Sequence, residues 1–423
     1  MDSAQIKNTD CFGDLMRPTY FYLAIPWLGC LVACSIVNLF YFPNTIVFPD
    51  EQRFLASAVR LAASGEFWVG GDRAWEMPGT AVFFAPFVLL FGADAAILPI
   101  RTAQSFLIVV QSALIALIAQ RLFGKTIIAF IAASLVALYP FFLFYQGLLL
   151  SETLFNALLL AGIASLYWWR ERGLRIDRAL VLTCACFAAA TMTKATLAIL
   201  PPLLIAATAW ASGVPLRRAF AILVVASCLY SALLSPWWIR NDILLGSFVP
   251  FTTNSAQNLY LGNNSRNPDA GIDWSSEVDP AVVARISALP DEVGRQRAFS
   301  KVAIDYIKEN PFVFVRSAAK KFVRFWNVVP NASGFKTGLY AIVSAASFGP
   351  ILALALICAM RRWCQWRLLG PLYLILGYFT LVHVITIASL RYRLPIESIL
   401  ILLAAEPLAA FIERVRRNVA RSA

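Results

Sequence analysis

Histidine and charged residues are scarce in this sequence. His383 is the single histidine among 423 residues, and Asp, Glu, Lys and Arg together make up 14% of the chain. Soluble domains carry about 25% charged residues, whereas 60% of this chain is hydrophobic. One histidine excludes a metal site built from several histidines, and the eight cysteines show no metal-binding spacing. We therefore expect a membrane protein, in which His383 is a hydrogen-bonded packing residue.

Ten apolar stretches predict an all-α fold with ten transmembrane helices, because a span needs about 20 apolar residues. They are residues 19–42, 102–120, 124–146, 148–169, 178–193, 195–211, 218–235, 337–360, 368–388 and 394–412. The run 79–98 is bounded by Pro78 and Pro99, so we expect an interfacial or re-entrant helix there.

The net charge of +12 fits arginines that fix membrane orientation better than it fits a nucleic-acid partner. The basic clusters that we place in the cytoplasm are Arg170/Arg172/Arg175/Arg178, Arg217/Arg218, Arg361/Arg362/Arg367 and Arg414/Arg416/Arg417. Ten spans then put both termini in the cytoplasm and residues 43–101 and 236–336 outside.

This topology divides the chain into three parts. Residues 1–235 form a transmembrane module that contains the first outer loop, 43–101. Residues 236–336 form an outer region, with loop at 254–280 and an amphipathic helix at 311–326 that either lies near lipid phosphates or is a plain anchor. Residues 337–423 form the last spans and a basic tail.

Four acids lie where outer loops meet spans, and charge at membrane depth needs a reason. Asp50 and Glu51 are adjacent, so their side chains diverge. We expect one to be a general base in a cleft and the other to hold a base or an arginine. Alternatively, Asp50 is the N-cap of a helix 52–64. Glu76 and Glu152 are further candidates, although Glu152 also suits a helix start.

Four cations lie on the same side, against the positive-inside rule: Lys194, Arg240, Arg391 and Arg393. Arginine forks and lysine point charges suit a phosphate. The alternative is structural pairing with Asp50, Glu51, Glu76 and Glu152.

An ordered set of motifs covers nearly the whole chain. It comprises Pro49-Asp50-Glu51, Glu76-Met77-Pro78, Arg101 to Arg121-Leu122-Phe123-Gly124, Ser151-Glu152-Thr153-Leu154, Thr193-Lys194, Pro236-Trp237-Trp238-Ile239-Arg240-Asn241, Gly246-Ser247-Phe248-Val249-Pro250, Asn258-Leu259-Tyr260-Leu261-Gly262-Asn263-Asn264 and Arg391-Tyr392-Arg393-Leu394-Pro395. With this set the chain resembles the GT-C glycosyltransferases of the protein O-mannosyltransferase and aminoarabinose-transferase branch.

The resemblance implies an inverting transfer of a sugar from a polyprenyl-phosphate donor to a hydroxyl acceptor at the outer leaflet of a bacterial inner membrane. It assigns the base to Asp50 and the donor phosphate to Lys194, Arg240, Arg391 and Arg393. Supporting residues are Glu76, Glu152, Asn241, Tyr260 and Tyr392. No metal or other cofactor is expected, although Asp50, Glu51 and Glu152 leave a divalent metal open.

One departure limits the resemblance. Met77 stands where the aminoarabinose transferases have lysine, so we do not expect transfer to lipid A. Only a basic tail follows the last span, so we expect residues 236–336 to hold any acceptor-recognition module.

Two other classes remain open: a flippase or transporter of a lipid-linked sugar, and a structural membrane subunit. Transporters place their sites near the membrane midplane, whereas these charges lie at one face, which favours the enzyme.

Overall fold

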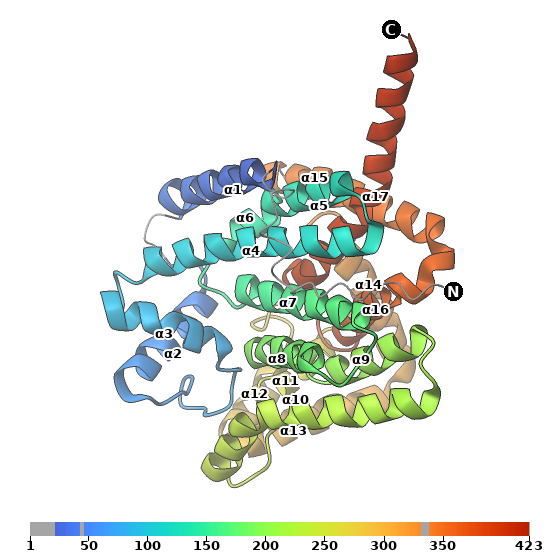
Figure 1. Cartoon of the computed structure of the whole chain (residues 1–423). Helices are drawn as coiled ribbons and strands as arrows, with labels where there is room; N and C mark the ends of the chain where they lie inside the picture. The colour runs from blue at the N-terminus through green and yellow to red at the C-terminus, as the bar shows by residue number, and fades with distance from the viewer. Residues whose placement is uncertain (1–21, 43–45, 331–337, 423) are drawn as a thin grey trace.

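The computed structural model describes residues 22–42, 46–330 and 338–422, and these ranges contain helices but no β-strand (Figure 1). The helices of the first half are α1 (Ala24–Ile36), η3 (Val37–Tyr41), α2 (Pro49–Ser64), α3 (Gly79–Phe91), α4 (Ile97–Phe123), α5 (Thr126–Ala137), α6 (Pro140–Gln146), α7 (Glu152–Glu171), α8 (Arg178–Thr193), η4 (Ala195–Leu197) and α9 (Leu200–Ala211). The second half contains α10 (Leu216–Leu245), α11 (Ser255–Gly262), α12 (Pro280–Ser287), α13 (Glu292–Glu309), α14 (Pro311–Trp326), α15 (Gly338–Arg361), η5 (Trp363–Gln365), α16 (Trp366–Ile385) and α17 (Leu390–Ser422).

Each of the ten expected spans overlaps one helix or, for 19–42, 124–146 and 195–211, two consecutive helices, but their number stays a prediction. Six helices of the described ranges are long and apolar enough to cross a membrane, or seven if the bent pair α5 and α6 counts as one span. The pair bends by 47° just before Pro140, because the residue before a proline is disfavoured in the helical region. The helices α3, α8 and α9 are apolar but shorter. The expected starts of two spans, residues 19–21 and 337, lie outside the described ranges.

The last helix forms the centre of the bundle. In α17, 78% of the apolar window is buried inside the protein, against 22% for the segment that joins α1 and η3. It packs against α15, α5, α7 and α16. We call the end of the bundle that holds α2 and the starts of α4, α7 and α17 the site end, and the other the opposite end.

The outer region differs from the sequence prediction in two places. First, α10 continues through Pro236 to Leu245, so residues 236–245 belong to a long helix. Second, residues 255–262 of the predicted loop form α11, because Ala256, Tyr260 and Leu261 recur at helical spacing and are buried. They belong to a small core of their own with Phe299 of α13.

Helices lie in both regions where the sequence predicts them outside the spans, but their position at the membrane stays a prediction. Within residues 43–101, α2 and α3 pack together, and α3 ends at Phe91, short of the expected 79–98. The amphipathic helix runs from Pro311 to Trp326, as predicted, with Phe312 89% exposed and Phe325 fully buried.

Candidate active site

The first turn of α2 separates the two neighbouring acids. Pro49 occupies the first helical position and Phe48 the N-cap. The Glu51 carboxylate accepts hydrogen bonds from the backbone N–H groups of Val47 and Phe48, both at 2.9 Å. The alternative in which Asp50 is the N-cap is therefore wrong, because Pro49 is the first helical residue and the N-cap lies two residues before Asp50. Glu51 caps the helix, which leaves the Asp50 side chain available.

The Glu51 side chain points away from the other acids. It is fully buried, and its Oε2 accepts a hydrogen bond from the Leu149 N–H at 2.9 Å. The Arg101 Nη2 lies 3.9 Å from the same oxygen. As expected for neighbouring residues, the two acid side chains diverge, and each lies near a different arginine.

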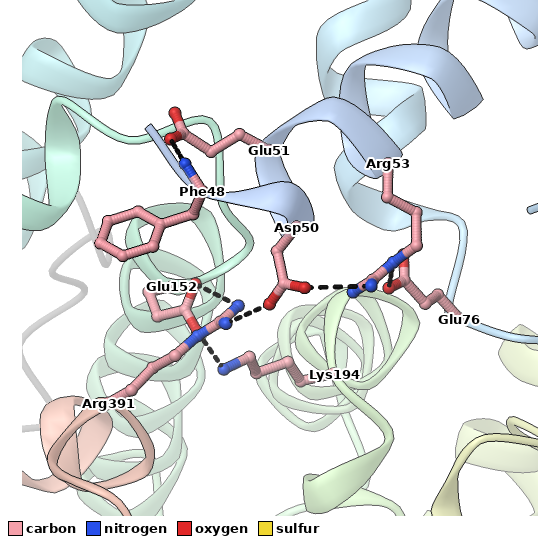
Figure 2. Close-up of polar contacts among 8 residues, drawn as sticks. All are labelled: Phe48, Asp50, Glu51, Arg53, Glu76, Glu152, Lys194 and Arg391. Atoms are coloured by element: carbon pink, nitrogen blue, oxygen red, sulfur yellow. Dashed lines mark hydrogen bonds and ion pairs between the residues drawn. The ribbon is translucent and has the colours of Figure 1, made fainter. Parts of the chain in front are cut away.

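Arg391, at the start of α17, brings two acids together (Figure 2). Its Nη1 donates to Asp50 Oδ2 at 2.5 Å, while its Nε and Nη2 donate to the two Glu152 oxygens. Lys194 Nζ lies 2.7 Å from Glu152 Oε1. Four segments far apart in the sequence thus meet: the starts of α2, α7 and α17, and the residue after α8.

Arg53 joins this group, although the sequence analysis did not select it. Its Nη1 lies 3.0 Å from Asp50 Oδ1, and its Nε lies 2.5 Å from Glu76 Oε1 (Figure 2). The spacing of Asp50 and Arg53, three residues apart in a helix, was the available signal. We call Asp50, Arg53, Glu76, Glu152, Lys194 and Arg391 the charge cluster.

The charge cluster contains three acids and three bases and is open on one side. The Glu152 side chain is only 2% exposed, whereas the Asp50 and Arg53 side chains are each 34% exposed. A ligand therefore reaches Asp50 and Arg53 first, while the buried Glu152 carboxylate binds Lys194 and Arg391 on the protein side of the cluster.

The pKa values of Asp50 and Glu76 shift in opposite directions. Burial disfavours the Asp50 carboxylate, but the guanidinium groups of Arg391 and Arg53 outweigh burial and lower its pKa. For Glu76, burial outweighs the attraction of Arg53 and raises the pKa. Asp50 is thus held as a carboxylate at neutral pH, in a form that accepts a proton.

Glycine contacts fix the segments that carry the cluster. A Cβ on Gly79 would lie 2.7 Å from the Met192 carbonyl oxygen, so α3 starts directly against the end of α8. A Cβ on Gly262 would lie 1.9 Å from the Thr386 carbonyl oxygen. The Asn263 side chain donates to the Ile385 carbonyl at 2.9 Å. The outer region thereby holds the turn that leads into Arg391.

An aromatic stack lies beside the charge cluster. The Tyr392 ring stacks on His383 with centroids 4.7 Å apart, and Lys194 Nζ lies 5.7 Å from the Tyr392 ring centre. His383 Nδ1 is 3.2 Å from the Ile387 carbonyl oxygen. The prediction that His383 is a hydrogen-bonded packing residue is confirmed.

Apart from Glu51 and Tyr392, described above, four of the predicted site residues do not join the charge cluster. Arg240 donates to the carbonyl oxygens of Phe67 and Arg73. Asn241 binds the Val249 carbonyl oxygen at 2.9 Å. Arg393 is fully buried, 2.6 Å from Glu397, and Tyr260 lies in the core of the outer region.

An apolar groove of about 470 Å³ has Arg391 among its lining residues. Its walls come from η3, α6, α15 and the turn before α17. The aromatic residues among them are Tyr41, Phe48, Phe141, Phe144, Tyr145 and Tyr340. In the described ranges, no group of three or more His, Cys, Asp or Glu residues is placed to hold a metal ion.

No protein-family model and no curated protein matches this sequence. Among solved structures, the chain is similar to the archaeal oligosaccharyltransferase AglB from Archaeoglobus fulgidus, in complex with an inhibitory peptide and a dolichol-phosphate. The TM-score is 0.58 at 13% identity, over 95% of this chain and 52% of that chain. The apo form of the Archaeoglobus fulgidus oligosaccharyltransferase gives a TM-score of 0.57 at 12% identity, again over 95% and 52%.

A weaker likeness links the chain to ArnT from Cupriavidus metallidurans bound to undecaprenyl phosphate, with a TM-score of 0.45 at 16% identity, over 92% of this chain and 78% of that chain. The chain spans about half the length of the oligosaccharyltransferases. The similarity to AglB confirms the helical, GT-C-like membrane fold that the sequence predicted.

Proposed function

We propose that the protein is a glycosyltransferase that moves a sugar from a polyprenyl-phosphate donor to a hydroxyl group of a glycan, lipid or protein. One observation carries this proposal: Arg391 lines the apolar groove and is also paired with Asp50. A lipid chain in the groove would therefore place its phosphate beside the arginine that is paired with the Asp50 carboxylate.

The donor would bind through both of its parts. The aliphatic and aromatic walls of the groove suit a hydrocarbon chain, and the Arg391 fork and the Lys194 ammonium suit the phosphate. Both cations are already held by Glu152, so little reorganisation is needed on binding. The AglB structure similar to this chain contains a dolichol-phosphate, which agrees with a lipid-linked donor.

Asp50 would act as the general base in a direct displacement. The acceptor oxygen attacks the anomeric carbon and passes its proton to the Asp50 carboxylate. The bond between the anomeric carbon and the phosphate oxygen breaks, and its electron pair stays on the phosphate, so the configuration inverts. The phosphate gains one negative charge, which Arg391 and Lys194 stabilise, so it needs no proton to leave.

A coupling follows from the shared arginine. When the phosphate attracts Arg391, the Asp50 carboxylate loses part of the positive field that lowers its pKa. Donor binding would therefore make Asp50 a stronger base at the step in which a base is needed.

The remaining assignments are part of the proposal. Glu152 and Glu76 position the cations, and Glu51 positions the first turn of α2. We assign Arg240, Arg393, Asn241 and Tyr260 to the framework, since each is bonded to backbone or buried away from the charge cluster. The site would face the outside of a bacterial inner membrane, with both termini in the cytoplasm.

The test measures release of free polyprenyl phosphate by purified protein in detergent, with a polyprenyl-phosphate-sugar donor and a panel of hydroxyl acceptors. Removal of a general base costs about 10²–10⁴-fold in rate, so Asp50→Asn should lose that factor. Asp94→Asn, at an exposed acid outside the cluster, should retain the wild-type rate. Donor binding without turnover by the wild type, across all sugars and acceptors, would favour the transporter. A fully active Asp50→Asn variant would remove Asp50 from the mechanism.

A further inference from the structure

The last turns of α17 lie outside the bundle. The helix passes Pro407, and from Phe411 to Ser422 its residues are exposed or half-buried. Figure 1 shows this segment projecting from the body of the protein and running across the direction of α4 and α7. We call residues 411–422 the arm. Because α4 and α7 run between the two ends of the bundle, the arm runs across the long direction of the bundle.

Two ion pairs fix where the arm leaves the bundle. Arg362, after the end of α15, lies 2.7 Å from Glu406, just before Pro407. Lys125, between α4 and α5, lies 2.9 Å from Glu413. Both contacts are at the opposite end, so the arm starts level with the ends of three spans.

The arm has an apolar stripe flanked by arginines. Phe411, Val415 and Val419 are four residues apart, so they share one helix face, and they are 65%, 44% and 61% exposed. The arginines are Arg414, Arg417 and Arg421, at spacings of three and four along one side of the stripe, and Arg416 on its other side.

We infer that the arm lies in the headgroup layer of the bilayer at the opposite end, with its arginines on the phosphates of anionic phospholipids. An apolar stripe between basic flanks is the pattern of a helix that lies in the membrane interface. The arm has four arginines and a single acid, Glu413, which Lys125 already holds. Two copies of the arm would therefore repel each other, whereas an anionic membrane surface attracts it along its whole length.

This inference does not depend on the proposed enzymatic function, and its test needs no activity. The full chain is labelled with an environment-sensitive fluorophore at Val419→Cys, in a background with Cys11, Cys186, Cys228 and Cys364 replaced by serine. It is reconstituted into vesicles of phosphatidylcholine alone or of phosphatidylcholine with phosphatidylglycerol. The matched control carries the label at Ala420→Cys, on a different face of the same turn. A third protein combines Val419→Cys with Arg414→Gln, Arg416→Gln, Arg417→Gln and Arg421→Gln.

The inference predicts a blue shift for the Val419 label in the anionic vesicles, a smaller shift for the Ala420 label, and a loss of the anionic effect in the four-glutamine protein. High salt should also reduce the effect, because it screens exposed charges. Equal shifts in both kinds of vesicle would overturn the inference. A shift that depends on protein density in the membrane and not on lipid charge would overturn it in favour of a second copy of the chain.

Discussion

Asp50 and Arg391 lie 341 residues apart in the sequence, yet Asp50 Oδ2 and Arg391 Nη1 are 2.5 Å apart. The same guanidinium also donates to Glu152. One side chain thus connects the first helix of the outer loop, the start of α7 and the central helix α17. The proposed chemistry depends on this connection more than on any single residue.

The first prediction contrasts two arginines. Arg391→Lys keeps the charge but loses the fork that reaches both Asp50 and Glu152, so transfer should fall by about 10²-fold, with weaker donor binding. Arg240→Lys should lower the thermal unfolding midpoint and leave donor affinity unchanged, because Arg240 binds the carbonyl oxygens of Phe67 and Arg73. Steady-state kinetics and donor titration check both variants. Loss of donor affinity in Arg240→Lys would return that residue to the phosphate site.

The second prediction concerns the buried pair Glu152 and Lys194. Glu152→Gln removes the carboxylate that Lys194 contacts and should cost about 3 kcal/mol of stability, as for one partner of a buried ion pair. The double variant Glu152→Gln with Lys194→Met should lose less than the sum of the two single variants. Thermal unfolding in detergent measures the midpoints. Additive losses would show that the pair is not coupled.

The third prediction concerns pH. Asp50 has a pKa below its ordinary value of 3.8, so its ion pairs contribute stability above that value and are lost as the pH falls through the lowered pKa. Arg53→Gln removes one of the two guanidinium groups responsible, while burial still acts to raise the pKa. The acid limb of kcat/KM should therefore move to higher pH.

Arg60→Gln is the matched control for this shift. Arg60 lies two turns along α2 and donates to the Trp68 carbonyl oxygen at 3.0 Å. Its replacement should leave the acid limb in place. If Arg53→Gln and the wild type share one limb, Asp50 is not the group that titrates.

The fourth prediction concerns the turn that precedes Arg391. Gly262→Ala forces the Thr386 backbone to move, since a Cβ there would lie 1.9 Å from its carbonyl oxygen. Transfer should fall and the unfolding midpoint should drop. Gly377→Ala in α16 meets nothing within 4 Å and should leave the protein unchanged or stabilise it by about 0.5–1 kcal/mol. A Gly262→Ala enzyme with normal kinetics would show that this contact does not position Arg391.

The sequence was sufficient to select Asp50, Glu152, Lys194 and Arg391, because charge in so apolar a chain is conspicuous. These four side chains meet because of where α2, α7 and α17 begin, and the composition of the sequence does not define these positions. The sequence predicts that Arg391 and Arg393 act together. In the structure both lie in α17, which begins at Leu390, and side chains two residues apart on a helix point to different faces.

Arg240 illustrates a second limit. Its span was expected to end at residue 235, which would have exposed it at the membrane surface. Instead α10 continues past Pro236 for nearly three more turns, and the guanidinium turns toward the first outer loop. The sequence does not single out Arg53, because an acid and a base three residues apart on a helix also form ordinary surface ion pairs. The structure shows that Glu76, which precedes α3, contacts the same arginine.

Arg391 also balances the charge of the cluster. Without it, Asp50, Glu76 and Glu152 face only Arg53 and Lys194, which leaves an excess of one negative charge. Arg391 belongs to the central helix α17 and supplies the missing positive charge. The charge balance of the site therefore depends on the packing of the helix that also forms the centre of the bundle.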